Sequence, residues 1–115
     1  MNLDRRIFLT AMAAATSITR AHQIVLARVN QSLAPFGLTF SRYEALVLIS
    51  LTRHGALPMG KIGERLQVHP TSVTNTIDRL VSDGLVTKEP HPTDGRATLA
   101  TITAAGRTIV DEATI

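Results

Sequence analysis

The chain of 115 residues contains no cysteine and no tryptophan, and it has only one tyrosine and three phenylalanines. Without cysteine it can form no disulfide, no thiolate metal site and no thiol-based redox switch. Its four histidines are scattered, with no pair at metal-ligand spacing on one helix, so we expect no metal and no other cofactor. There is also no phosphate-cradling glycine loop and no Ser-His-Asp arrangement, so the sequence predicts a protein that is not an enzyme.

The length is sufficient for one domain with a real core, but too short for two. The formal net charge is +3, with five basic residues and one acidic residue in segment 1–42. Residues 43–115 carry seven basic and eight acidic side chains. The positive excess therefore lies in the N-terminal third, and by itself it is only a weak indication of a nucleic-acid partner.

Residues 3 to about 34 predict one long α-helix. Apolar residues recur along it at spacings of three and four, and Pro35 and Gly37 follow at its end. Its paired arginines, the apolar run over residues 7–15 and an Ala-x-Ala site also resemble a twin-arginine export signal. Because the helical pattern continues past that site, we favour the uninterrupted helix, and export remains an alternative.

This helix carries more apolar surface than one small domain easily covers. Such a surface favours packing against a second copy of the chain, although a helix of the core is the simpler alternative. The residues that we expect at the dimer interface are Ile7, Phe8, Met12, Ile18 and Val25.

Three shorter helices are predicted after residue 40. The sequence S-R-Y-E at residues 41–44 has the pattern of a capping box and predicts a helix start, with Gly55 as the C-terminal stop. A short helix lies within residues 57–66. After a turn, a further helix spans residues 70 to about 83 and begins with proline, which suits the first helical position.

The helix predicted over residues 70–83 has two contrasting faces. The apolar face comprises Val73, Ile77, Leu80 and Val81. The residues that present hydroxyls, an amide and a guanidinium on the exposed side are Thr71, Ser72, Thr74, Asn75 and Arg79. Such groups hydrogen-bond to base edges and phosphates, which predicts entry into a DNA major groove. Asp78 shares this side, where a carboxylate is unfavourable against DNA, so we expect it to pair with an arginine.

Residues 85–90 and 97–103 predict the two strands of a β-hairpin. We expect Arg96, near the tip of the connecting turn, to enter a DNA minor groove, because a narrow groove concentrates negative potential. Asp94 is expected to hold the Arg96 guanidinium in a fork, and Gly95 to permit the tight turn between them. The alternative is an exposed hairpin with an incidental surface ion pair.

Helix, helix, turn, helix and β-hairpin is the order of a winged helix-turn-helix. The predicted fold class is thus mainly α with a small β-hairpin and a long N-terminal dimerisation helix. Residues 57–106 resemble the winged-helix core of the MarR family of bacterial transcription regulators. The matching motifs are V-x-x-x-x-V-T-N-x-I-D-R-L at 68–80, D-G-L-V at 83–86 and D-x-R at 94–96, in order and at family spacing.

This resemblance implies a cytoplasmic homodimer that binds a pseudo-palindromic operator in double-stranded DNA, with no membrane partner. Most such proteins are repressors, and many respond to a small-molecule effector. On charge and position, Lys61, Arg65 and Lys88 are assigned as phosphate contacts. The alternative function is a winged-helix module for protein contacts. It predicts apolar residues on the outer face of the helix at 70–83 and no cation on the wing.

Three segments are expected along the chain. Residues 1–40 form the dimerisation helix and connector, residues 41–103 form the winged helix-turn-helix, and residues 104–115 begin a C-terminal dimerisation helix. Family members continue through longer C-terminal helices than these twelve residues provide. We therefore expect either a fragment or a dimer that relies more heavily on its N-terminal helix.

Overall fold

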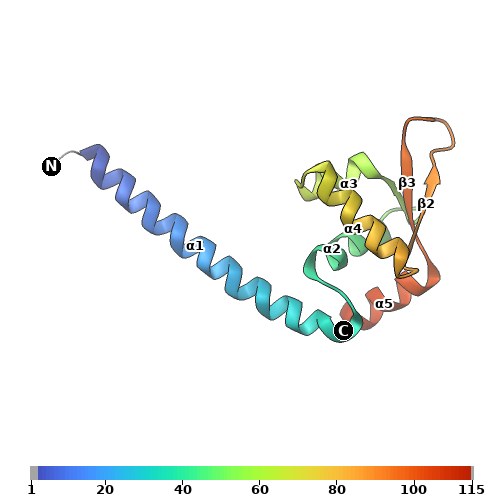
Figure 1. Cartoon of the computed structure of the whole chain (residues 1–115), viewed down its shortest axis with the longest axis horizontal. Helices are drawn as coiled ribbons and strands as arrows, with labels where there is room; N and C mark the ends of the chain where they lie inside the picture. Colours follow the sequence, from blue (N-terminus) through green and yellow to red (C-terminus); the bar gives the residue numbers. More distant parts are fainter. Residues whose placement is uncertain (1–2, 115) are drawn as a thin grey trace.

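The computed structural model describes residues 3–114 and shows a long helix that extends away from the other elements (Figure 1). This helix, α1 (Leu3–Leu33), is followed by a single 3-10 turn, η1 (Ala34–Phe36). Pro35 lies within the turn, and Gly37 follows it with a left-handed φ of 72°. The two residues thus end the long helix where the sequence predicts.

Thr39 and Asn30 together cap the next helix, α2 (Phe40–Ser50). The Thr39 hydroxyl accepts the N–H of Arg42 at 3.4 Å, and the Asn30 side-chain oxygen accepts the first N–H of the helix at 2.7 Å. These bonds satisfy donors that a helix N-terminus otherwise leaves unpaired. The capping box predicted at residues 41–44 is therefore wrong, because the cap lies two residues earlier and those residues are already helical.

A short strand follows α2 that was not predicted from the sequence. The helix ends at Ser50, and the chain turns through Gly55 (φ 68°) into β1 (Ala56–Pro58). Gly55 therefore shapes the turn before β1, and the prediction that it stops the helix is wrong. With only three residues, β1 is too short to show the alternation by which a strand is recognised in sequence.

The three strands form one antiparallel sheet in the order β1-β3-β2. The predicted hairpin is present as β2 (Val86–Pro90) and β3 (Thr98–Ile102), with Lys88 opposite Ala100. β1 pairs with the other edge of β3, so that Leu57 also lies opposite Ala100. The sheet packs against the helices through all three of its strands, and the turn between β2 and β3 projects beyond them (Figure 1).

The remaining helices are α3 (Met59–Leu66), α4 (Pro70–Ser82) and α5 (Ala104–Thr114). α4 packs against α2, α3 and β2, and α5 packs against α2. The largest fully buried side chains are Leu46, Ile49, Ile62, Ile77, Leu80 and Val86. One core therefore joins α2, α3 and α4 to the base of the hairpin and fixes the direction in which α4 and the hairpin point.

The apolar face of α4 is narrower than predicted. Val73, Ile77 and Leu80 are buried as expected, but Val81 is 37% exposed. At 100° per residue, Val81 lies at the edge of the face that the other three define, so its predicted place in the core is wrong.

The predicted segments 1–40 and 104–115 include Met1, Asn2 and Ile115, which lie outside the described residues. Over residues 3–114, no helix combines the length and the hydrophobicity needed to cross a membrane.

Candidate nucleic-acid interface

The exposed face of α4 carries all five residues predicted to read the major groove. The side chains of Thr71, Ser72 and Asn75 form no hydrogen bond with any other described residue, so their donors and acceptors face solvent. The hydroxyl of Thr74 donates to the carbonyl of Pro70 at 3.1 Å and retains its acceptor capacity. This face therefore presents a row of unengaged polar groups near the helix N-terminus.

Arg79, the fifth residue of the predicted face, lies further along α4. Its Nε donates to the Asp83 carboxylate at 3.4 Å, within an ion pair in which the Arg79 side chain remains 58% exposed. An ion pair at this exposure contributes little stability and is readily exchanged for another anion.

Asp78 pairs with Lys88 and not with an arginine as expected. The Lys88 ammonium lies 2.7 Å from the Asp78 carboxylate, because α4 packs beside β2 at this point. Arg79, next to Asp78 in the chain, points instead to Asp83 one turn further on. Lys88 therefore provides less uncompensated positive charge for a phosphate than its predicted role as a phosphate contact assumes.

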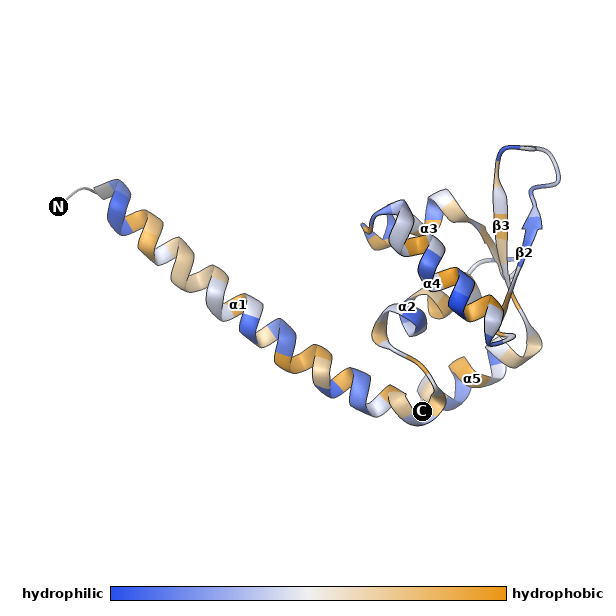
Figure 2. Cartoon of the chain, viewed as in Figure 1, coloured by the Kyte–Doolittle hydropathy of each residue, from blue (hydrophilic) through white to orange (hydrophobic). Residues whose placement is uncertain are grey.

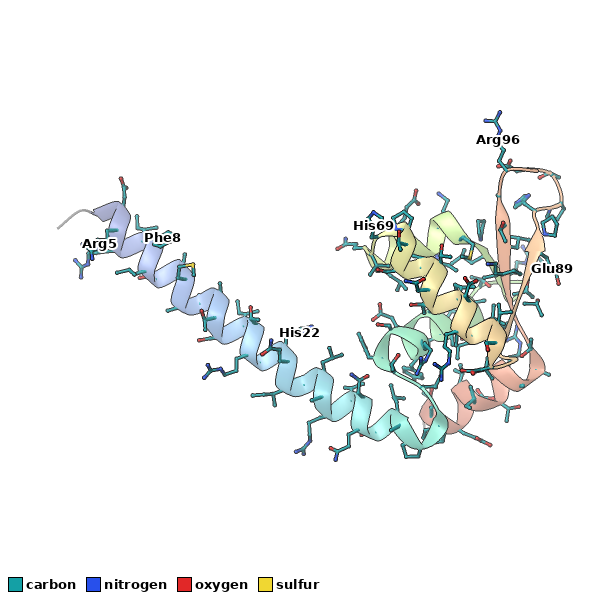
Figure 3. The ribbon with its side chains drawn as sticks, in the orientation of Figure 1. Arg5, Phe8, His22, His69, Glu89 and Arg96 are labelled. Carbon is teal, nitrogen blue, oxygen red and sulfur yellow. The ribbon has the colours of Figure 1, made fainter. Side chains whose placement is uncertain are left out.

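Arg96 projects from the tip of the hairpin, away from the body (Figure 3). The Asp94 carboxylate accepts the backbone N–H of Arg96 at 3.0 Å, and no ion pair joins it to the Arg96 guanidinium within the described part of the chain. The predicted fork is therefore wrong. A short carboxylate bonds more readily to a backbone N–H two residues ahead than to the far end of a long side chain.

The hairpin turn is held by His91, which was not predicted to have this role. The His91 Nδ1 accepts the N–H groups of Thr93 and Asp94, each at 3.1 Å. Backbone hydrogen bonds between His91 and Ala97 and between Ala97 and Asp94 close the same turn. Gly95 does not adopt a positive φ, and a Cβ at that position would meet no atom within 4 Å. The turn therefore does not require glycine, contrary to the prediction.

A groove of about 630 Å³ separates the hairpin from α3. Its walls include Lys61, Lys88, His91 and Arg96. Lys61 also pairs with Glu64 at 3.2 Å, with both side chains more than half exposed. Arg65, the third predicted phosphate contact, is exposed on α3 and has no ion pair in the described structure.

The five residues predicted for the dimer interface lie on the exposed part of α1. Their side chains are between 49% (Met12) and 70% (Ile18) exposed. Figure 2 shows hydrophobic residues along the part of α1 that extends away from the body, and Figure 3 shows Phe8 far from it. Only the end of α1 near Val29 and Leu33 packs against the core. A long apolar face is thus left uncovered by this chain.

A second cavity, of about 390 Å³, lies between α1, α2, α3 and α4. Its lining includes His22 and Leu26 from α1, Glu44 from α2, Ile62 from α3 and Ile77 from α4. The cavity is mainly apolar with two ionisable groups at its wall, and it touches both the long helix and the inner side of α4. Within residues 3–114, no three His, Asp or Glu side chains are grouped so that they could hold a metal ion.

Together, α2, α3, α4 and the hairpin define a winged helix-turn-helix protein. Residues 40–98 match the model of the MarR family. The chain belongs to the MarR family.

Solved structures and curated relatives agree with this assignment. A MarR family transcriptional regulator from Streptomyces coelicolor is 62% identical, with a TM-score of 0.85 over 91% of this chain and 72% of that protein. A MarR mutant from Escherichia coli complexed with operator DNA is 25% identical, with a TM-score of 0.83 over 98% and 74%. An HTH-type transcriptional regulator from Mycobacterium leprae is 38% identical over 66 residues, which are 57% of this chain and 46% of that protein. The chain thus matches about half the length of such curated relatives.

Proposed function

We propose that this chain binds double-stranded DNA as a homodimer and regulates transcription from the cytoplasm. In the complex, each α4 lies in a major groove and each hairpin reaches a flanking minor groove of a pseudo-palindromic site. The observation that carries the proposal is the polar face of α4 together with Arg96 at the hairpin tip, which forms no ion pair with another described residue. Hydroxyl and amide groups can hydrogen-bond to base edges, and an arginine side chain is attracted to the negative potential of a narrow minor groove.

The alternative, a winged-helix module for protein contacts, is less well supported by the same surface. A protein interface is expected to have apolar or aromatic anchors at its centre. The outer face of α4 offers the hydroxyls of Thr71 and Ser72 and the amide of Asn75, and the exposed Val81 lies at the edge of the buried face.

The homodimer would use the uncovered face of α1. Ile7, Phe8, Met12, Ile18 and Val25 are all about half exposed or more, which is unfavourable for so many large apolar side chains on one helix. A second copy covers the same face on both chains, as two-fold symmetry requires. The symmetry also brings two α4 helices to one side of the dimer, where they can reach half-sites about one helical turn of DNA apart.

We further propose that the protein is a repressor that a small-molecule effector releases from DNA. The cavity beside His22 and Glu44 supports this, because it is bounded by the proposed dimerisation helix and by the inner side of α4. An effector that binds more tightly to one arrangement of these helices than to another shifts the population toward that arrangement.

The experiment selects duplexes from random DNA and measures the affinity of the recovered site for matched variants. The variant Arg96→Ala should bind the selected site about 5- to 150-fold more weakly, the loss typical of one specific groove contact. The control is Arg53→Ala, which removes the same charge from an exposed arginine in the turn between α2 and β1. It should change the affinity by less than about threefold.

Equal losses in the two variants would mean that Arg96 acts only through its charge and would contradict its groove contact. Failure to recover any selected duplex would favour the protein-contact module.

A further inference from the structure

The tripeptide His-Pro-Thr occurs twice in the chain, at residues 69–71 and 91–93. In both copies the histidine Nδ1 accepts the backbone N–H of the threonine two residues later, and both distances are 3.1 Å. In the second copy the same nitrogen also accepts the N–H of Asp94. One copy begins α4 and the other forms the hairpin turn, so the motif sits at both elements of the proposed DNA contact.

The proline explains why the histidine bonds to the threonine. Proline has no N–H, so the first backbone donor after the histidine belongs to the threonine, and its fixed φ presets the turn. The imidazole Nδ1 is attached where the side-chain oxygen of asparagine would be, so the histidine replaces the usual capping residue. His69 is the N-cap of α4 in an extended conformation, with φ −64° and ψ 144°.

These bonds require one particular tautomer of both neutral rings. A backbone N–H can only donate, so each Nδ1 must carry a lone pair, and each proton must be on Nε2. Protonation of His69 would leave the Thr71 N–H without its acceptor and place a positive charge at the positive end of the α4 dipole. Protonation of His91 would remove the acceptor shared by two N–H groups of the turn.

The charges around the two rings differ. The charged residues that line the groove shared with His91 are Lys61, Glu64, Lys88, Asp94 and Arg96. Three of these are cations, and two of the cations are already paired with carboxylates. His69 is exposed and forms no ion pair within the described residues. Within residues 3–114, neither ring forms an ion pair with a carboxylate.

We propose that His69 and His91 are positioning residues whose neutral imidazoles fix the start of α4 and the hairpin turn for sequence-specific DNA binding. The proposal rests on the function proposed above. A protonated Nδ1 cannot accept these N–H groups, so specific binding then weakens when the solution is acidified. A protonated imidazole also attracts DNA phosphates, so acidification does not lower the affinity for unrelated DNA. The quantity to measure is therefore the ratio of the affinity for the selected duplex to the affinity for an unrelated duplex.

The test compares the full chain with the double variant His69→Asn, His91→Asn. Asparagine offers an oxygen in the place of Nδ1 and does not titrate. From pH 8 to pH 5.5, the ratio of affinities for the selected and an unrelated duplex should fall at least about threefold for the unmodified chain, as for a lost cap. It should stay within about twofold for the double variant. The control His54→Asn, at an exposed histidine without a hydrogen bond in the described structure, should follow the unmodified chain.

The double variant His69→Ala, His91→Ala should show the reduced ratio already at pH 8, while its circular dichroism confirms that it is folded. Identical pH profiles for the unmodified chain and the asparagine variant would overturn the proposal, and so would an unchanged ratio for the alanine variant.

Nitrogen NMR of the free protein at pH 8 tests the proposal without DNA, since both rings must show a proton on Nε2. A proton on Nδ1 in either ring overturns it. Loss of DNA binding by every chain, including the unmodified one, contradicts the proposed function instead, and the ring tautomers then decide the positioning role alone.

Discussion

Gly106 in α5 lies tightly against Leu85 and Ile102, and its replacement by alanine gives a sharp test of the fold. An added Cβ would collide with the carbonyl oxygen of Leu85 and would lie 2.7 Å from the Ile102 Cγ1. The Leu85 carbonyl cannot move away freely, because it accepts the N–H of Thr103 at 3.0 Å. The Gly106 N–H is fixed as well, by the Thr103 hydroxyl at 3.0 Å.

Two opposing effects set the size of the change. Replacing a helical glycine by alanine stabilises a helix by up to about 1 kcal/mol. Overpacking costs about 1 to 3 kcal/mol, and a collision with hydrogen-bonded backbone belongs at the upper end of that range. We therefore expect Gly106→Ala to lower the free energy of unfolding by about 2 kcal/mol. For a domain of this size, that corresponds to a fall in Tm on the order of 10 °C.

Thermal unfolding followed by circular dichroism, at one fixed protein concentration, measures this change. The matched control is Gly60→Ala in α3, because a Cβ there meets no atom within 4 Å and the φ of Gly60 is not positive. The control variant should have an unchanged or higher Tm, because alanine adds up to about 1 kcal/mol to the stability of a helix relative to glycine. A Tm for Gly106→Ala equal to that of the control would refute the close packing of Gly106 against Leu85 and Ile102.

Three further substitutions test the surface. In competition titrations, Asn75→Ala should weaken binding to the selected duplex by about 1 to 3 kcal/mol and weaken binding to unrelated DNA much less. Equal losses on the two duplexes would contradict the role of Asn75 as a base reader. Phe8→Glu places a charge on the uncovered face of α1 and should shift the mass in sedimentation from dimer to monomer, whereas an unchanged dimer would move the interface elsewhere. Gly95→Ala should leave DNA affinity within about twofold, because the backbone is ordinary and the space is open; a large loss would restore the predicted need for glycine.

The exposed face of α4 could be predicted because helical periodicity is a local property. Once Pro70 marks the first turn, the spacing of Val73 and Ile77 determines which side is buried, and Asn75 must lie opposite. The expected place of Arg96 at the tip of a hairpin likewise followed from the proline and glycine content of the turn. Neither inference needs contacts between distant parts of the chain.

The errors concern choices between competing partners. Asp94 could bond to the Arg96 guanidinium or to its N–H, and only the actual turn geometry decides between them. The Asp78–Lys88 pair depends on how β2 lies beside α4, which no local pattern reveals. The strand β1 exists because it pairs with β3 more than forty residues later, as Ala56 does with Thr101. A strand of three residues without that partner has no signal of its own.

The claim that two DNA-reading surfaces act together in one dimer is tested most directly by the salt dependence of binding to the selected duplex. Lys61 and Arg65 from each of two copies give about four phosphate contacts, which predict a slope of log affinity against log salt of roughly −4. A slope of that size, with a stoichiometry of two chains per duplex, is the expected result. A slope near zero, or one chain bound per duplex with a slope half as steep, would contradict the account.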